Sequence, residues 1–176
     1  GSVNKLGIYL VLYPIFAILS ASLLVTNISG FILGLIFSIT SLTFLYAALN
    51  NGGWGIRLLG YQDLGYWASN TAKIGYSFYI ISIIALFAFI ISYPYYSSPS
   101  GLIGVLYLLL ISQIAFFISF LLLGIGYIRH GSRAKQWLLL TGGVFSLLVS
   151  ILIVIGVALI GAFLGSLSSN TANGGP

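Results

Sequence analysis

One stretch decides the fold class of this chain: residues 80–87 read IISIIALF. A strand of a membrane β-barrel alternates apolar and polar residues, whereas this stretch is apolar almost all round. In hydrocarbon every backbone N–H and C=O group must be paired within the protein, and a helix pairs them inside one segment. This requirement overrides the preference of the β-branched residues for strands. The stretch therefore predicts a helix that crosses a membrane.

Apolar stretches of similar character lie on both sides of this one. Each has about the 20 residues that a helix needs to cross a hydrocarbon core ~30 Å thick. The predicted spans are residues 6–28, 30–49, 74–93, 102–128 and 138–164. The predicted fold class is all-α: a polytopic transmembrane helix bundle with about five spans, in a single membrane domain covering 1–176.

The composition excludes most soluble and catalytic classes. Of 176 residues, 60% are hydrophobic and 4% are charged, against roughly 25% charged residues in an ordinary soluble domain. One acidic residue, one His and no Cys leave little for acid–base catalysis or metal ligation. We therefore expect no catalytic, cofactor-binding or metal-binding residues, and we expect an integral protein of the cell membrane or of a membrane-derived envelope.

The basic residues predict the orientation. All of them lie before the first span, between the second and third, or between the fourth and fifth, which is one side of a five-span chain. Because cytoplasmic loops carry an excess of Lys and Arg, the N-terminus is predicted inside and the C-terminus outside. Anionic headgroups attract such residues. The candidate headgroup contacts are Arg57, Lys73, Arg129, Arg133 and Lys135, and Lys5 precedes the first span.

Two further segments lie outside the predicted spans. In 50–73, Trp54, Leu58 and Tyr61 recur at three- and four-residue steps, which predicts a short helix lying on the cytoplasmic membrane surface. The several glycines of this segment favour the alternative of an irregular loop anchored by aromatic residues. The segment 165–176 is uncharged and rich in Ser, Asn and Gly, and it is expected to form a polar tail on the outer side.

Small and polar residues are the candidates for helix packing. Gly30 with Gly34, and Gly161 with Gly165, form pairs four residues apart that let helices approach closely. Gln113, near the middle of the fourth span, is the most polar side chain at membrane depth. We favour an interhelical hydrogen bond for it over a place in a pore. Hydroxyl groups in the spans are expected to bond back to their own helices.

The function expected by elimination is that of a non-enzymatic structural or accessory membrane protein. Its expected partners are membrane lipids and copies of itself or other membrane subunits. The alternative is a passive channel or transporter for an uncharged solute that uses Gln113 and hydroxyl groups. A lipid-modifying enzyme using His130 and Asp63 ranks last, since no nucleophile accompanies them. Nucleic acid is not expected, because orientation explains the net charge of +5.

The last third of the chain carries a resemblance to a family. Residues 121–131 read LLLGIGYIRHG, and residues 141–144 read TGGV. A span that ends in Gly-x-Gly-aromatic, a basic residue and Gly, before a span that begins near a Gly-Gly pair, resembles a family of uncharacterised archaeal multi-pass membrane proteins. The resemblance implies a polytopic fold and an archaeal origin, and it implies no activity.

Overall fold

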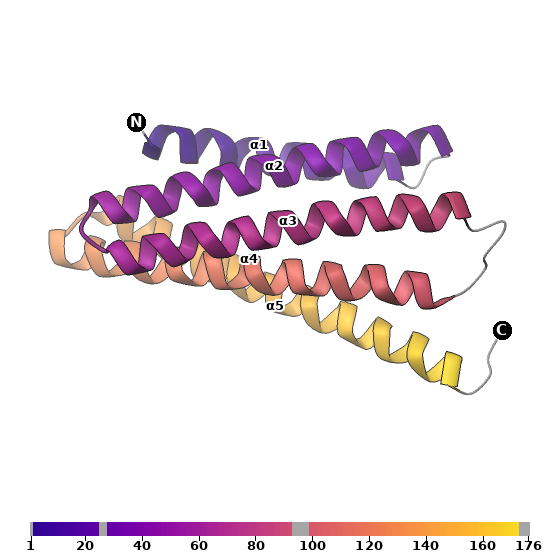
Figure 1. The fold of residues 1–176 in the computed structure, drawn as a ribbon. Helices are drawn as coiled ribbons and strands as arrows, with labels where there is room; N and C mark the ends of the chain where they lie inside the picture. Colours follow the sequence, from indigo (N-terminus) through magenta and orange to yellow (C-terminus); the bar gives the residue numbers. More distant parts are fainter. Residues whose placement is uncertain (1, 25–27, 93–98, 173–176) are drawn as a thin grey trace.

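The protein is built from five α-helices that follow one another along the chain (Figure 1). A computed structural model describes residues 2–24, 28–92 and 99–172. The helices are α1 (Ser2–Leu24), α2 (Ile28–Leu58), α3 (Gln62–Ser92), α4 (Pro99–Ala134) and α5 (Trp137–Ala172). These described ranges contain no strand, so the prediction of an all-α fold is confirmed.

Four of the helices are long and apolar enough to cross a membrane. Their apolar parts are Ile32–Leu58, Gln62–Phe89, Gly101–Ala134 and Trp137–Ser166. In α1 the apolar stretch within the described residues is shorter, Val11–Ser20. By length and composition the chain is therefore a multi-pass membrane protein with four candidate spans, in the places expected from the sequence.

Helices α2 to α5 are longer than the predicted spans, and this changes the interpretation of two segments. Residues 50–73 form neither a separate interfacial helix nor an irregular loop, because all but the turn 59–61 belongs to α2 and α3. The predicted polar tail is helical as far as Ala172, within α5, and 173–176 lie outside the described residues. With 36 residues each, α4 and α5 are about 54 Å long, well above the ~30 Å hydrocarbon core.

Two short turns join α2 to α3 and α4 to α5, and both end the preceding helix in the same way. Gly60 has a φ of 105°, and Lys135 has a φ of 53°. The following N–H group in each case bonds back five residues, from Tyr61 to the carbonyl of Ile56 and from Gln136 to that of Gly131. This left-handed cap satisfies carbonyls that the helix end would leave unpaired.

The arrangement is an open array around a three-helix centre. Within the described residues each helix packs on its neighbours in sequence, and α2 also contacts α4. Thus α1 touches α2 alone and α5 touches α4 alone, so these two helices form opposite edges (Figure 1). The buried core lies mainly on α2, α3 and α4. Its members include Leu45, Leu49, Ile56, Ala68, Ala72, Phe116, Phe120 and Leu123.

Candidate functional site

Pairs of glycines set the closest helix crossings. A Cβ atom added to Gly53 of α2 would lie 2.8 Å from the carbonyl oxygen of Gly65 in α3. A Cβ atom added to Gly143 of α5 would lie 2.9 Å from the carbonyl oxygen of Gly124 in α4. Real Cβ atoms are essentially never found below 3.0 Å from such a neighbour. The backbones therefore meet at distances that only glycine allows.

Hydroxyl groups bridge the helices beside these crossings. Ser112 and Ser119 of α4 donate hydrogen bonds to the carbonyls of Gly75 and Ala68 in α3, at 2.7 and 2.8 Å. The hydroxyl of Tyr127, further along α4, donates to the carbonyl of Gly52 at 3.2 Å. The expectation that hydroxyl groups bond back to their own helices is therefore wrong for these two serines, which bind a neighbouring helix.

The hydroxyl groups of α2 bond back to their own helix, as expected, only in part. Thr40 and Thr43 donate to carbonyls of their own helix, at 3.0 and 2.8 Å. Thr43 also contacts the hydroxyl of Tyr76 at 2.9 Å, and Ser38 bonds to that of Tyr79. These groups are engaged in helix packing and in their own backbone, which leaves no continuous row of free hydroxyls along α2.

Gln113 does not make the interhelical bond that the sequence favoured. Its side chain is half-buried on α4, and it forms no hydrogen bond to any residue that the structure describes. The interhelical hydrogen bonds to backbone carbonyls of α3 come instead from Ser112 and Ser119, which lie on α4 like Gln113.

The two predicted glycine pairs have different surroundings. Gly30 and Gly34 are buried, and the carbonyl of Gly34 accepts a 2.7 Å hydrogen bond from Ser20, so Gly34 lies at the contact between α1 and α2. Gly161 and Gly165 are exposed on α5, and a Cβ atom at either position would meet nothing within 4 Å. The second pair therefore has no packing role among the described residues.

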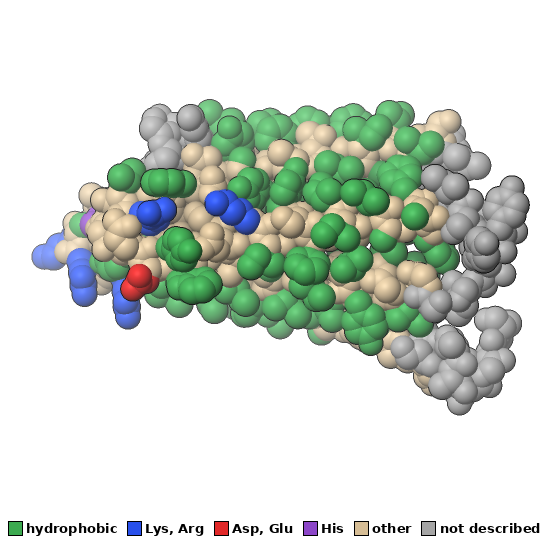
Figure 2. Space-filling model, viewed as in Figure 1, with side chains coloured by type: hydrophobic (Ala, Val, Ile, Leu, Met, Phe, Trp, Pro, Cys, Tyr) green, Lys and Arg blue, Asp and Glu red, His purple; other side chains and the backbone are tan. Residues whose placement is uncertain are grey.

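The basic side chains gather at the end of the molecule that holds the two short turns (Figure 2). The guanidinium of Arg57 stacks 4.5 Å above the ring of Trp54, and its Nε donates to Gln62 at 3.3 Å. Lys73 and Arg129 are exposed. The start of α1 lies at this same end of the array, and the end of α5 lies at the other (Figure 1).

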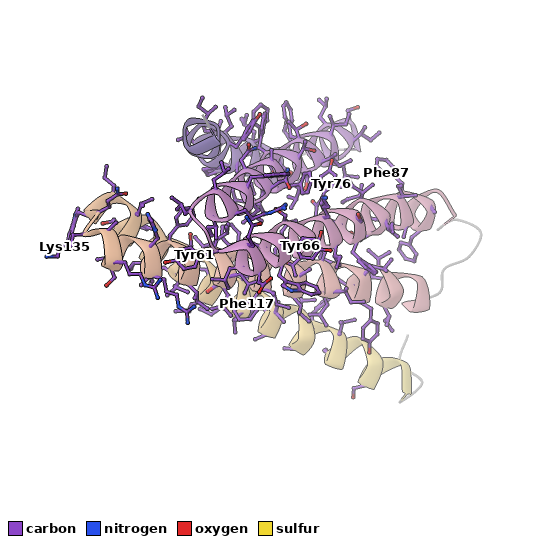
Figure 3. The ribbon with its side chains drawn as sticks, turned by 60° about the vertical axis from the view of Figure 1, so that its left-hand side comes forward. Tyr61, Tyr66, Tyr76, Phe87, Phe117 and Lys135 are labelled. Atoms are coloured by element: carbon purple, nitrogen blue, oxygen red, sulfur yellow. The ribbon has the colours of Figure 1, made fainter. Side chains whose placement is uncertain are left out.

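Tyr61 links the two turns. Figure 3 labels Tyr61 near the end of the molecule that holds both turns. Arg133 of α4 donates a 3.5 Å hydrogen bond to the hydroxyl of Tyr61, and the ring of His130 packs edge-on against the ring of Tyr61 with centroids 6.1 Å apart. Asp63 is exposed, and no hydrogen bond or ion pair joins it to His130 in the described ranges. The structure thus places the ring of His130 against that of Tyr61.

A cavity of about 310 Å³ opens at the turn between α4 and α5. Lys135 lies at the tip of this turn (Figure 3). The lining combines a cation, a hydroxyl, an amide and an indole, and it consists of Gly131, Ser132, Lys135, Gln136, Trp137 and Leu140. Lys135 was predicted as a headgroup contact, but the cavity could not be predicted from the sequence, because the shape of the cavity depends on the left-handed backbone of that residue.

The part of the chain that the structure describes holds no group of three or more His, Cys, Asp or Glu residues placed to bind a metal ion. No protein-family model, curated protein or solved structure matches this chain. The site-like features are therefore the helix contacts, the exposed small residues of α5, and the cavity at the basic end.

Proposed function

We propose that the chain is a five-span membrane protein with its N-terminus inside and its C-terminus outside. The basic residues of the two short turns support this orientation, because they gather at one end of the helix array (Figure 2) and such residues are retained on the cytoplasmic side. In this arrangement α1 is the fifth span.

This orientation predicts the labelling of single cysteines. Ser132, in the last turn of α4, and Ser169, near the end of α5, are both exposed. In intact cells an impermeant thiol reagent should label Ser169→Cys and leave Ser132→Cys unlabelled. Permeabilised cells serve as the control, in which both should react. Labelling of Ser132→Cys alone in intact cells would reverse the orientation.

We propose, as its function, that the protein is a non-enzymatic accessory membrane subunit that assembles with itself through α5. The observation that carries this proposal is the exposure of Gly161 and Gly165, whose small size relieves no crowding among the described residues. Glycine costs a helix about 1 kcal/mol relative to alanine, so it needs a compensating contact. Close approach of a second helix is the usual compensation in a membrane.

The neighbouring residues of α5 extend the same surface. Ala158, Ala162 and Ser169 are also small and exposed. Positions 158, 161, 165 and 169 are three or four residues apart, and so are 158, 162 and 165, so these residues lie on neighbouring parts of one helix face. Because α5 packs on α4 alone, most of its circumference is open to lipid or to another chain.

Self-association is tested by Gly161→Leu. The larger side chain keeps the span apolar but separates two helix backbones, so dispersion contacts are lost that lipid replaces only in part. We expect the dissociation constant in bicelles to rise about tenfold, measured by native mass spectrometry and crosslinking. Gly104→Leu is the matched control, because Gly104 is equally unobstructed but lies on α4. A strictly monomeric wild type, or equal losses in both variants, would overturn the proposal.

A further inference from the structure

We propose that the cavity at the turn between α4 and α5 binds the phosphate group of an anionic phospholipid, with an acyl chain lying along α5. The inference rests on the membrane-spanning arrangement proposed above. Besides the indole of Trp137, three residues with donor side chains line the cavity: Lys135, with an ammonium group, Ser132, with a hydroxyl group, and Gln136, with an amide group. No acidic side chain is among the lining residues.

The donors suit a phosphate because all three can give hydrogen bonds to its oxygens, and the ammonium group also balances its charge. Arg129 and Arg133 are exposed on the same final turns of α4. Three basic residues, Arg129, Arg133 and Lys135, therefore lie within seven positions of the chain at the end of α4 and in the turn that follows it. Asp63, the acidic residue of the chain, lies on α3 and does not line the cavity.

The surroundings of the cavity point to a lipid as the source of this phosphate. Trp137, which lines the cavity, has 76% of its surface exposed, and Leu138 beside it has 85% exposed. A free phosphate ion would not explain such apolar exposure beside a cation. A phospholipid does, because indole rings favour the level where headgroups meet acyl chains.

The path for an acyl chain begins at the same indole. Trp137, Val144 and Ile151 are each seven residues apart, so they share one face of α5, and all three are exposed. Fourteen residues of helix are about 21 Å long, enough to cross one leaflet of a hydrocarbon core ~30 Å thick. The lipid is thus held by its phosphate at one end and by an apolar helix face along its length.

Quenching of Trp137 fluorescence by brominated lipids tests the site. The full chain carrying Trp54→Phe and Trp67→Phe retains Trp137 as its one indole and is reconstituted in bilayers of phosphatidylcholine. Brominated phosphatidylglycerol is then compared with brominated phosphatidylcholine. Since a basic residue near the surface contributes about 1 kcal/mol, Lys135 alone should give about a fivefold preference for phosphatidylglycerol.

Two variants that each remove one positive charge test whether the preference for phosphatidylglycerol depends on Lys135. Lys135→Gln should remove it, whereas Lys73→Gln should retain it, because Lys73 is also exposed but does not line the cavity. Lys135→Arg keeps the charge and should retain most of the preference. The melting temperature of each variant verifies folding separately from lipid binding. Equal quenching by the two lipids, or equal effects of the two glutamine variants, would overturn the proposal.

Two further measurements identify the molecule that occupies the cavity. Inorganic phosphate, at an ionic strength matched with chloride, should leave the preference unchanged, because it cannot use the apolar face of α5. If phosphate abolishes the preference, the cavity is a site for free anions and the lipid proposal is wrong. Quenching that falls as the protein-to-lipid ratio rises, whatever the lipid, would instead show a second copy of the chain covering this face.

Discussion

Gly143→Ala should lower the melting temperature by several degrees, while Gly142→Ala, one residue away, should leave it unchanged or raise it slightly. The new methyl group at Gly143 would lie 2.9 Å from the carbonyl oxygen of Gly124 and from the backbone nitrogen of Ile128, so α4 and α5 would have to separate. Overpacking of this kind costs about 1–3 kcal/mol. For a chain of this size that is a shift of roughly 2–12 °C.

The adjacent glycine makes the comparison independent of helix propensity. Gly142 is exposed, and a Cβ atom there meets nothing within 4 Å, so alanine should contribute up to about 1 kcal/mol of propensity. The two variants are compared by thermal unfolding in lipid nanodiscs, followed by circular dichroism. Shifts of the same sign and size would contradict the close crossing of α4 and α5.

Phe116→Ala should destabilise the centre of the array by about 3 kcal/mol. Phe116 is 1% exposed and belongs to the largest fully buried side chains, and its ring covers Gly75 at the contact of α3 with α4. Truncation of a buried phenylalanine costs about 3–5 kcal/mol in soluble proteins. The lower end applies here, because separated helices remain in apolar lipid and little transfer from water is involved.

The measurement is again the melting temperature, with a decrease of roughly 6–12 °C expected for Phe116→Ala. Ile118→Ala is the control on the same helix, because Ile118 is exposed and its truncation creates no internal cavity. We expect a shift of no more than about 2 °C for that variant. If the melting temperature of Ile118→Ala fell as far as that of Phe116→Ala, the loss of stability would be due to lost apolar surface and not to a cavity.

The positions of the helices could be predicted from the sequence, but the residues at which they begin and end could not. Apolar runs locate four spans because hydrocarbon leaves the backbone no alternative to a helix. The run Asn50-Asn51-Gly52-Gly53 is poor in helix formers, which made 50–73 look separate. In the structure α2 continues through it, because Gly53 packs on Gly65 and the hydroxyl of Tyr127 binds the carbonyl of Gly52. These contacts come from distant residues and outweigh local propensity.

The sequence likewise predicted some features of the candidate site and not others. The spacing of Gly30 and Gly34 predicted a helix contact, and the structure buries both residues and bonds the carbonyl of Gly34 to Ser20 of α1. The meeting of Gly124 with Gly143 has no spacing that could reveal it, because the chain has 22 glycines and the register of two helices decides which of them face each other. The cavity at Lys135 depends in turn on a backbone angle that a lysine rarely adopts.

The edge positions of α1 and α5 allow each of these two helices to separate from the other four on its own. Each edge helix rests on one neighbour, so it can detach while the contacts among α2, α3 and α4 persist. Partial unfolding in proteins proceeds through such cooperative units, from the least to the most tightly held. Loss of α1 or α5 would therefore leave the three central helices still packed on one another, so each edge helix can move as a unit of its own.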